Sequence, residues 1–193
     1  MDWNILISSG MGALVGSSLT LIATLISHNL QCSNQNKKEN ELICGLLQSI
    51  HDEIKTLWEV YNDGMGNCLE ALEDGQPLKY YYPITQEYFT VYTTNAILIG
   101  KIKDHDLRKN IISTYTKAKG LIDSYRMNND LVYKYEHSYW RFQETNSPIH
   151  RSSMNAHHQA LVKYAKGLKE THNDVKQKVQ NLLGELEKEV LNK

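Results

Sequence analysis

An uncharged segment near the start of the chain constrains this sequence more than any other feature. The residues from Ile5 to Ile26 form a run of 22 that contains no Asp, Glu, Lys, Arg, His, Asn or Gln. A helix rises about 1.5 Å per residue, so this run would cover about 33 Å, which is enough to cross the hydrocarbon core of a bilayer. The sequence therefore predicts a single transmembrane helix, within an anchor over residues 1–30.

The flanks of this segment predict its orientation. No Lys or Arg precedes it, whereas Lys37 and Lys38 follow it. Cationic residues are retained on the cytoplasmic side, so we expect the N-terminus outside and the large C-terminal part in the cytoplasm. A cleaved signal peptide would begin with basic residues and have a shorter apolar core, so we predict that the segment is not removed.

Small residues recur on one side of the predicted span. Ser8, Gly12, Gly16 and Thr20 are spaced four apart, and the glycines form a GxxxG pair. Such a stripe lets helix backbones approach closely in lipid, which predicts self-association or packing against the span of a partner. The alternative is that small residues are simply tolerated in an anchor.

Apolar residues recur at helical spacing through most of the remaining sequence. After a polar linker at residues 31–40, steps of three and four run from Leu42 to Leu72 and from Leu107 to Val132, and a shorter helix fits Thr85–Ile102. Few positions interrupt these patterns, because the chain has only 11 Gly and 3 Pro. We predict an all-α fold in which one N-terminal transmembrane helix precedes an antiparallel bundle of three long helices and one short helix. The bundle domain is expected over residues 41–193.

The last predicted helix has the most regular pattern in the chain. It follows an interruption expected at Thr145–Ser153, and its apolar positions alternate in steps of four and three, as in a coiled-coil seam. The polar His172 lies within this seam, where it could specify register or partner, but we expect it half-exposed at one end of the bundle. The seam comprises Leu161, Ala165, Leu168, His172, Val175, Val179, Leu182 and Leu186.

Tyrosine is concentrated between the first long helix and the short one. The chain has 12 Tyr against 2 Phe, and Tyr80, Tyr81, Tyr82 and Tyr88 fall within or beside one loop. Tyrosine combines a large apolar ring with a polar tip, a combination that is enriched at protein interfaces. These residues are the candidate interaction surface for a protein partner. The alternative is that they pack in the core and close the end of the bundle.

The sequence offers no recognisable catalytic or metal-binding motif. GxSxG, Walker, GxGxxG and HExxH patterns do not occur, and neither do paired Glu-x-x-His units. His157 and His158 are adjacent and would point in different directions on a helix, so they do not form a chelating pair. We therefore expect no catalytic site, no metal and no cofactor. The balance of 21 Lys+Arg against 22 Asp+Glu also argues against a nucleic-acid partner.

From Tyr80 to Tyr125 the chain reads YYYPITQEYFTVYTTNAILIGKIKDHDLRKNIISTYTKAKGLIDSY. This stretch resembles part of a group of uncharacterised small bacterial proteins with one N-terminal transmembrane span and a helical cytoplasmic domain. The resemblance covers about a quarter of the chain and brings no assigned activity or site residue. It implies a single-pass protein of the inner (cytoplasmic) membrane.

Two functions of different classes fit these features. The first is a membrane-anchored, non-enzymatic interaction or scaffold protein that recruits a partner at the inner membrane, where tethering raises the effective concentration. The alternative is a membrane-bound sensory or effector protein whose bundle binds a signal and whose span oligomerises, altering permeability. A helical hydrolase or nuclease is disfavoured, because it would need a constellation of catalytic residues that the sequence does not offer.

Overall fold

Every regular element among the described residues is a helix. The structure, a computed structural model, describes residues 3–84 and 87–191, and the side chains within residues 24–84 and 87–189. The predicted all-α fold is therefore confirmed. The chain divides into two compact units: unit 1 comprises Met1–Gly45 and unit 2 comprises Leu46–Lys193.

The first helix, α1, extends over Trp3–Tyr61 and contributes to both units. Residues 31–40, expected as a polar linker, are helical within it. The sequence explains this continuity, because neither Gly nor Pro occurs between Gly16 and Gly45 to end a helix.

The predicted membrane span falls largely where side chains are not described. From Ile5 to Ala23 it lies outside the described side chains, as does the small-residue stripe. In the part of the chain that the structure describes, no helix combines the length and the apolar character needed to cross a membrane. The stripe comprises Ser8, Gly12, Gly16 and Thr20.

Unit 2 begins within α1, and two short helical segments follow the end of α1. A π-helical turn, η1 (Asn62–Gly66), follows α1 directly, and a short helix, α2 (Asn67–Glu70), follows η1. The apolar pattern extends to Leu72, and the helical segment ends two residues earlier, at Glu70. A non-helical segment, here named the strap, then leads through residues 71–84 and 87–89 to the next helix.

The predicted short helix is divided in two. The helices α3 (Thr90–Thr94) and α4 (Ala96–Gly100) are separated at Asn95, and the expected start at Thr85 lies outside the described residues. The division has a local cause, because the Asn95 side chain donates a hydrogen bond of 2.8 Å to the Val91 carbonyl and so competes with the backbone.

The helix α5 (His105–Thr145) is the first of two long helices in unit 2. Its start follows from Asp104, which precedes it as N-cap. The Asp104 Oδ1 atom accepts hydrogen bonds of 2.9 Å from the backbone N–H groups of Asp106 and Leu107. These groups would otherwise lack a partner at a helix start.

The second long helix, α6 (Pro148–Leu191), begins almost at once. The interruption expected at Thr145–Ser153 was too long, since only Asn146 and Ser147 separate the two helices. Asn146 has a left-handed backbone (φ 47°), which closes α5, and proline suits the first position of the next helix because its missing N–H has no partner there.

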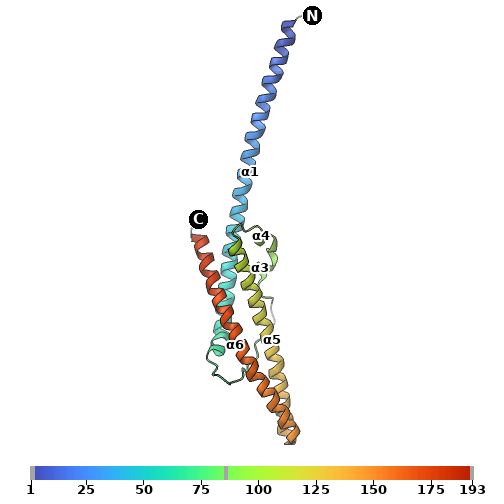
Figure 1. The fold of residues 1–193 in the computed structure, drawn as a ribbon, viewed down its shortest axis with the longest axis vertical. Helices are drawn as coiled ribbons and strands as arrows, with labels where there is room; N and C mark the ends of the chain where they lie inside the picture. Colours follow the sequence, from blue (N-terminus) through green and yellow to red (C-terminus); the bar gives the residue numbers. More distant parts are fainter. Residues whose placement is uncertain (1–2, 85–86, 192–193) are drawn as a thin grey trace. The chain divides into compact units, whose positions relative to one another are not determined.

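The core of unit 2 lies along the facing sides of these helices. The helices α5 and α6 run side by side and antiparallel (Figure 1). Each residue of the predicted α6 seam is at most 2 % exposed, and Ile50 and Ile54 of α1 are buried as well. The helical bundle is thus confirmed, with two very short helices in place of the single short one.

Candidate functional site

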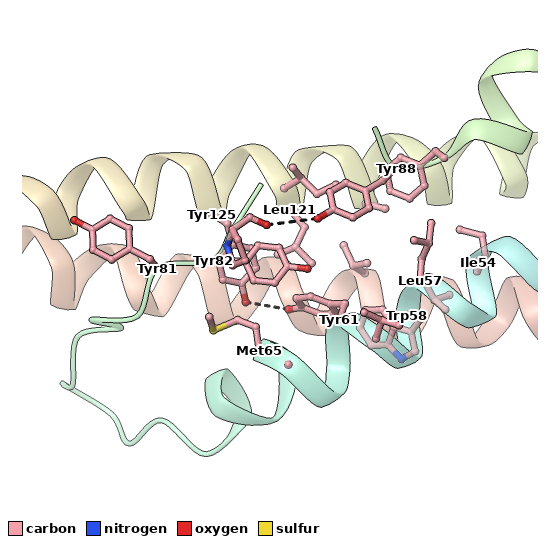
Figure 2. Close-up of a pocket in the computed structure, with 18 residues that line it drawn as sticks. Ile54, Leu57, Trp58, Tyr61, Met65, Tyr81, Tyr82, Tyr88, Leu121 and Tyr125 are labelled. Carbon is pink, nitrogen blue, oxygen red and sulfur yellow. Dashed lines mark hydrogen bonds between the residues drawn. The ribbon is translucent and has the colours of Figure 1, made fainter. Parts of the chain in front are cut away.

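A pocket of about 490 Å³ lies in unit 2 between the end of α1, the strap, α5 and α6 (Figure 2). This volume is within the range of small-molecule sites, about 300–1,000 Å³. Every described residue that lines it is uncharged, and most are apolar or aromatic. They are Ile54, Leu57, Trp58, Val60, Tyr61, Gly64 and Met65 from α1 and η1, Tyr81, Tyr82, Pro83, Tyr88 and Phe89 from the strap, Ala118, Leu121, Ile122 and Tyr125 from α5, and Val175 and Val179 from α6.

Three tyrosine rings meet in the wall of the pocket. The centre of the Tyr82 ring lies 4.8 Å from that of Tyr125 and 6.0 Å from that of Tyr61, and the rings of Tyr61 and Tyr125 are also 6.0 Å apart. Tyr61 meets both of the other rings edge to face, a preferred geometry for aromatic pairs. Figure 2 shows that these rings come from three separate segments, α1, the strap and α5.

Side chains of α5 hold the strap against the helix. The Asn129 amide makes two hydrogen bonds to the backbone of Tyr82: Nδ2 donates to the carbonyl oxygen at 2.8 Å, and Oδ1 accepts from the N–H at 3.1 Å. Asn128 donates a third bond, of 3.3 Å, to the carbonyl of Leu78. These bonds satisfy strap backbone groups that have no helical partner and so fix the position of Tyr82.

The candidate interaction residues do not form one surface. Tyr82 and Tyr88 line the pocket and are half-buried. Tyr81 also lines it, is 47 % exposed, and donates a hydrogen bond of 3.2 Å to Glu136. Tyr80 is 65 % exposed and does not line the pocket.

A chain of hydrogen bonds leads from the pocket wall to the surface. The Tyr125 and Tyr61 hydroxyls are 3.0 Å apart, and the Tyr61 hydroxyl lies 2.7 Å from His172 Nδ1. His172 Nε2 lies 2.8 Å from Glu70 Oε1, which also accepts a bond of 2.7 Å from Lys176 Nζ. This hydrogen-bond chain therefore joins α5, α1, α6 and α2.

The burial of His172 corrects our expectation of a half-exposed residue at a bundle end. Its side chain is 0 % exposed. Both ring nitrogens have partners, so the polar ring is tolerated in the core. Trp58 stacks on one side of the ring, with ring centres 5.7 Å apart.

Gly66 makes room for this ring. A Cβ atom at position 66 would lie 3.3 Å from His172 Cε1 and 2.7 Å from Asn62 Oδ1, which is closer than carbon and oxygen normally approach. The π-helical turn η1 ends at this glycine, and such turns recur at functional sites because they displace side chains from regular helical positions.

Hydrogen bonds to charged groups and burial shift the pKa values of residues in this hydrogen-bond chain in opposite directions. Lys176 and His172, by their hydrogen bonds, hold the pKa of Glu70 below its ordinary value. Burial raises the pKa of Tyr61, and it raises the pKa of Tyr125 to about 12. At neutral pH the carboxyl is therefore ionised and both phenols keep their protons.

A second polar cluster surrounds Glu53 of α1. Its carboxylate accepts bonds from the N–H groups of Val91 (2.6 Å) and Tyr92 (3.3 Å) at the start of α3, and from the Tyr115 hydroxyl (2.7 Å). A helix start carries partial positive charge, which the carboxylate complements. Burial, followed by the contact with Glu53, raises the pKa of Tyr115.

The sequence patterns did not identify Glu53, Glu70 and Asn129. Each is a common polar residue in a helical sequence, and its importance depends on the segment that packs against it.

Among the residues that the structure describes, no three His, Cys, Asp or Glu side chains are arranged to hold a metal ion. Comparison with family models, curated proteins and solved structures finds no match for this chain.

Proposed function

We propose that unit 2 binds a small, mostly apolar molecule in its pocket and that the chain acts as a membrane-bound sensory protein. The observation that supports this function is an uncharged pocket of about 490 Å³ lined by aromatic rings. Pockets of this size and character bury most of the surface of a small ligand. Catalysis is not part of the proposal, because the raised pKa of Tyr61 disfavours the phenolate that a nucleophile or base would require.

The proposed location rests on the uncharged segment. The run from Ile5 to Ile26 is long enough for one crossing of the inner membrane, and Lys37 and Lys38 favour a cytoplasmic position for the rest of the chain. Carbonate extraction tests the anchor: the full-length chain should remain in the membrane fraction. Its release into the aqueous fraction would contradict the anchor but not the pocket.

The pocket itself is tested by filling it. Ala118 lines the pocket, and in Ala118→Trp a large ring would occupy the space. Equilibrium dialysis of naphthalene derivatives against the full chain in amphipol should detect binding to the natural protein and only background partition with the variant. Equal uptake by the two proteins, with equal helix content by circular dichroism, would contradict the proposal.

Recruitment of a protein partner is a second candidate, and it rests on different residues. Tyr133 and Trp140, in the last third of α5, and Ile149, at the start of α6, are 62 %, 63 % and 77 % exposed. Exposed aromatic residues are enriched at interfaces. Crosslinking in cells should then capture a partner with the natural chain but not with Trp140→Ser, while recovery of the chain alone would count against this function.

A further inference from the structure

Aromatic rings are concentrated in the lining of the pocket. Seven of its 18 lining residues are aromatic, whereas aromatic residues make up 9 % of the chain. Tyr61 and Tyr125 are only 9 % and 0 % exposed, so little of either side chain is open to a ligand. Trp58, Tyr82 and Tyr88 are half-buried, and each therefore keeps more of its surface open. Figure 2 shows that these three rings come from two separate segments, α1 and the strap.

The polar groups of the lining already have partners within the protein. Four of the lining tyrosines use their hydroxyl groups in hydrogen bonds to other residues of the chain: Tyr61, Tyr81, Tyr88 and Tyr125. No described lining residue is charged. A ring, in contrast, still offers its faces and edges after its hydroxyl has a partner, and aromatic pairs prefer offset-stacked or edge-to-face contact. The pocket therefore offers a ligand mainly ring surface.

We propose that the pocket selects flat, uncharged aromatic molecules, which pack against the rings of Trp58, Tyr82 and Tyr88. This inference rests on the proposed function of the pocket and adds the chemical class of its ligand. A charged ligand would lose its hydration without gaining a counter-ion. A saturated ring of the same carbon skeleton would gain from burial, but it is puckered and makes no aromatic pair.

A matched pair of probes tests this selectivity. The molecules 2-naphthol and decahydro-2-naphthol share one carbon skeleton and one hydroxyl group, but only 2-naphthol is flat and aromatic. In equilibrium dialysis at about pH 7, the full chain in amphipol should bind 2-naphthol about fivefold more tightly, the effect of one aromatic pair beyond its apolar area. The Ala118→Trp variant supplies the background of partition for each probe.

Two double variants test whether the lining rings cause the preference. Tyr82→Leu combined with Tyr88→Leu replaces two lining rings by aliphatic side chains, and the Asn129 bonds to the strap remain because they involve only the backbone of Tyr82. The ratio of the two affinities should fall to about twofold or less. Tyr80→Leu combined with Tyr133→Leu is the matched control. These side chains are 65 % and 62 % exposed and do not line the pocket, so the ratio should stay near the natural value.

The possible outcomes separate the two proposals. Equal affinities for both probes in the natural chain, or tighter binding of the saturated one, would overturn the inference and leave the pocket standing. A preference that persists unchanged in the Tyr82→Leu, Tyr88→Leu variant, with helix content preserved, would also overturn it, because the lining rings would then not be its cause. Failure of both probes to bind above the Ala118→Trp background would overturn the proposed function, and this inference with it.

Discussion

At the scale of single residues, the pocket wall depends on a histidine that has a partner at each ring nitrogen and on one ring face. His172 bonds to Tyr61 through one nitrogen and to Glu70 through the other, and Trp58 stacks on its ring. A buried polar group without partners costs about 1–3 kcal/mol, so these contacts are what make the position tolerable. Gly66 is part of the same arrangement, because its backbone passes beside the ring.

A pair of glycine variants tests this arrangement. Gly66→Ala should lower the free energy of unfolding by about 1–3 kcal/mol, because the new methyl group meets His172 and Asn62. Gly64→Ala is the matched control: nothing lies within 4 Å of its Cβ position, and alanine stabilises a helix by about 0.5–1 kcal/mol relative to glycine. Urea unfolding followed by circular dichroism measures both. An equal change in the two variants would contradict the close approach at Gly66.

At the scale of elements, the strap and α3 are held by side chains from the long helices. Asn129 of α5 bonds to the backbone of Tyr82, and Glu53 of α1 accepts from two N–H groups at the start of α3. The helix α3 has only five residues, which is too short for stable helix formation in isolation. These segments therefore depend on a few polar contacts rather than on a broad apolar face.

Removing the Asn129 contacts should loosen the strap. In Asn129→Ala both hydrogen bonds to Tyr82 are lost, so the free energy of local opening should fall by about 1–2 kcal/mol and exchange of the Tyr82 amide should quicken about tenfold. Asn129→Asp keeps the acceptor and loses the donor, so its exchange rate should be intermediate. Hydrogen–deuterium exchange measures the series. Unchanged exchange at Tyr82 would show that other contacts hold the strap.

Removing the Glu53 carboxylate should affect α3 and the long helices together. Glu53→Ala leaves the N–H groups of Val91 and Tyr92 and the Tyr115 hydroxyl without their acceptor, and should lower the free energy of unfolding by about 2–3 kcal/mol. Glu59→Ala, at an exposed position of the same helix, is the control and should change stability by about 0.5 kcal/mol or less. Thermal unfolding distinguishes the two.

At the scale of the whole molecule, buried tyrosines set the alkaline limit of stability. Burial raises the pKa of Tyr61 and Tyr115, and that of Tyr125 to about 12 from an ordinary 10. A raised pKa means that the unfolded state releases its protons first, so stability is complete below about pH 10 and is lost as the pH rises through the folded values.

The expected alkaline transition can be assigned to particular residues. Tyr125 alone should account for a loss of about 2–3 kcal/mol as the pH rises from about 10 to 12. Tyr125→Phe should therefore show a shallower decline of stability over this interval, even though it is less stable at neutral pH. Tyr133→Phe, at a position that is 62 % exposed, should leave the slope unchanged. Unfolding curves at a series of pH values, with tyrosinate absorbance recorded in parallel, provide the measurement.

The sequence indicates a feature well when the interacting residues are close in the sequence and the pattern itself records the interaction. It indicates a feature poorly when the pattern does not record the interaction. The start of α5 rests on a local signal, because the Asp104 cap bonds to residues two and three positions away. The short helix was predicted as one element, because the periodicity of its apolar residues does not register the bond from Asn95 to Val91. The interruption predicted at Thr145–Ser153 is longer than the observed one, because Pro148 serves as the first residue of α6.

The amino-acid sequence by itself determined that this chain is helical and which face of each long helix is apolar, because these properties depend on residues three or four positions apart. Only the tertiary structure decided that Tyr61 would meet Tyr125, 64 positions away, and His172, 111 positions away. The pocket and the hydrogen bonds beside it arise from such distant pairs. No local pattern specifies them, because a polar residue has the same sequence signature whether its partner is water or another buried side chain.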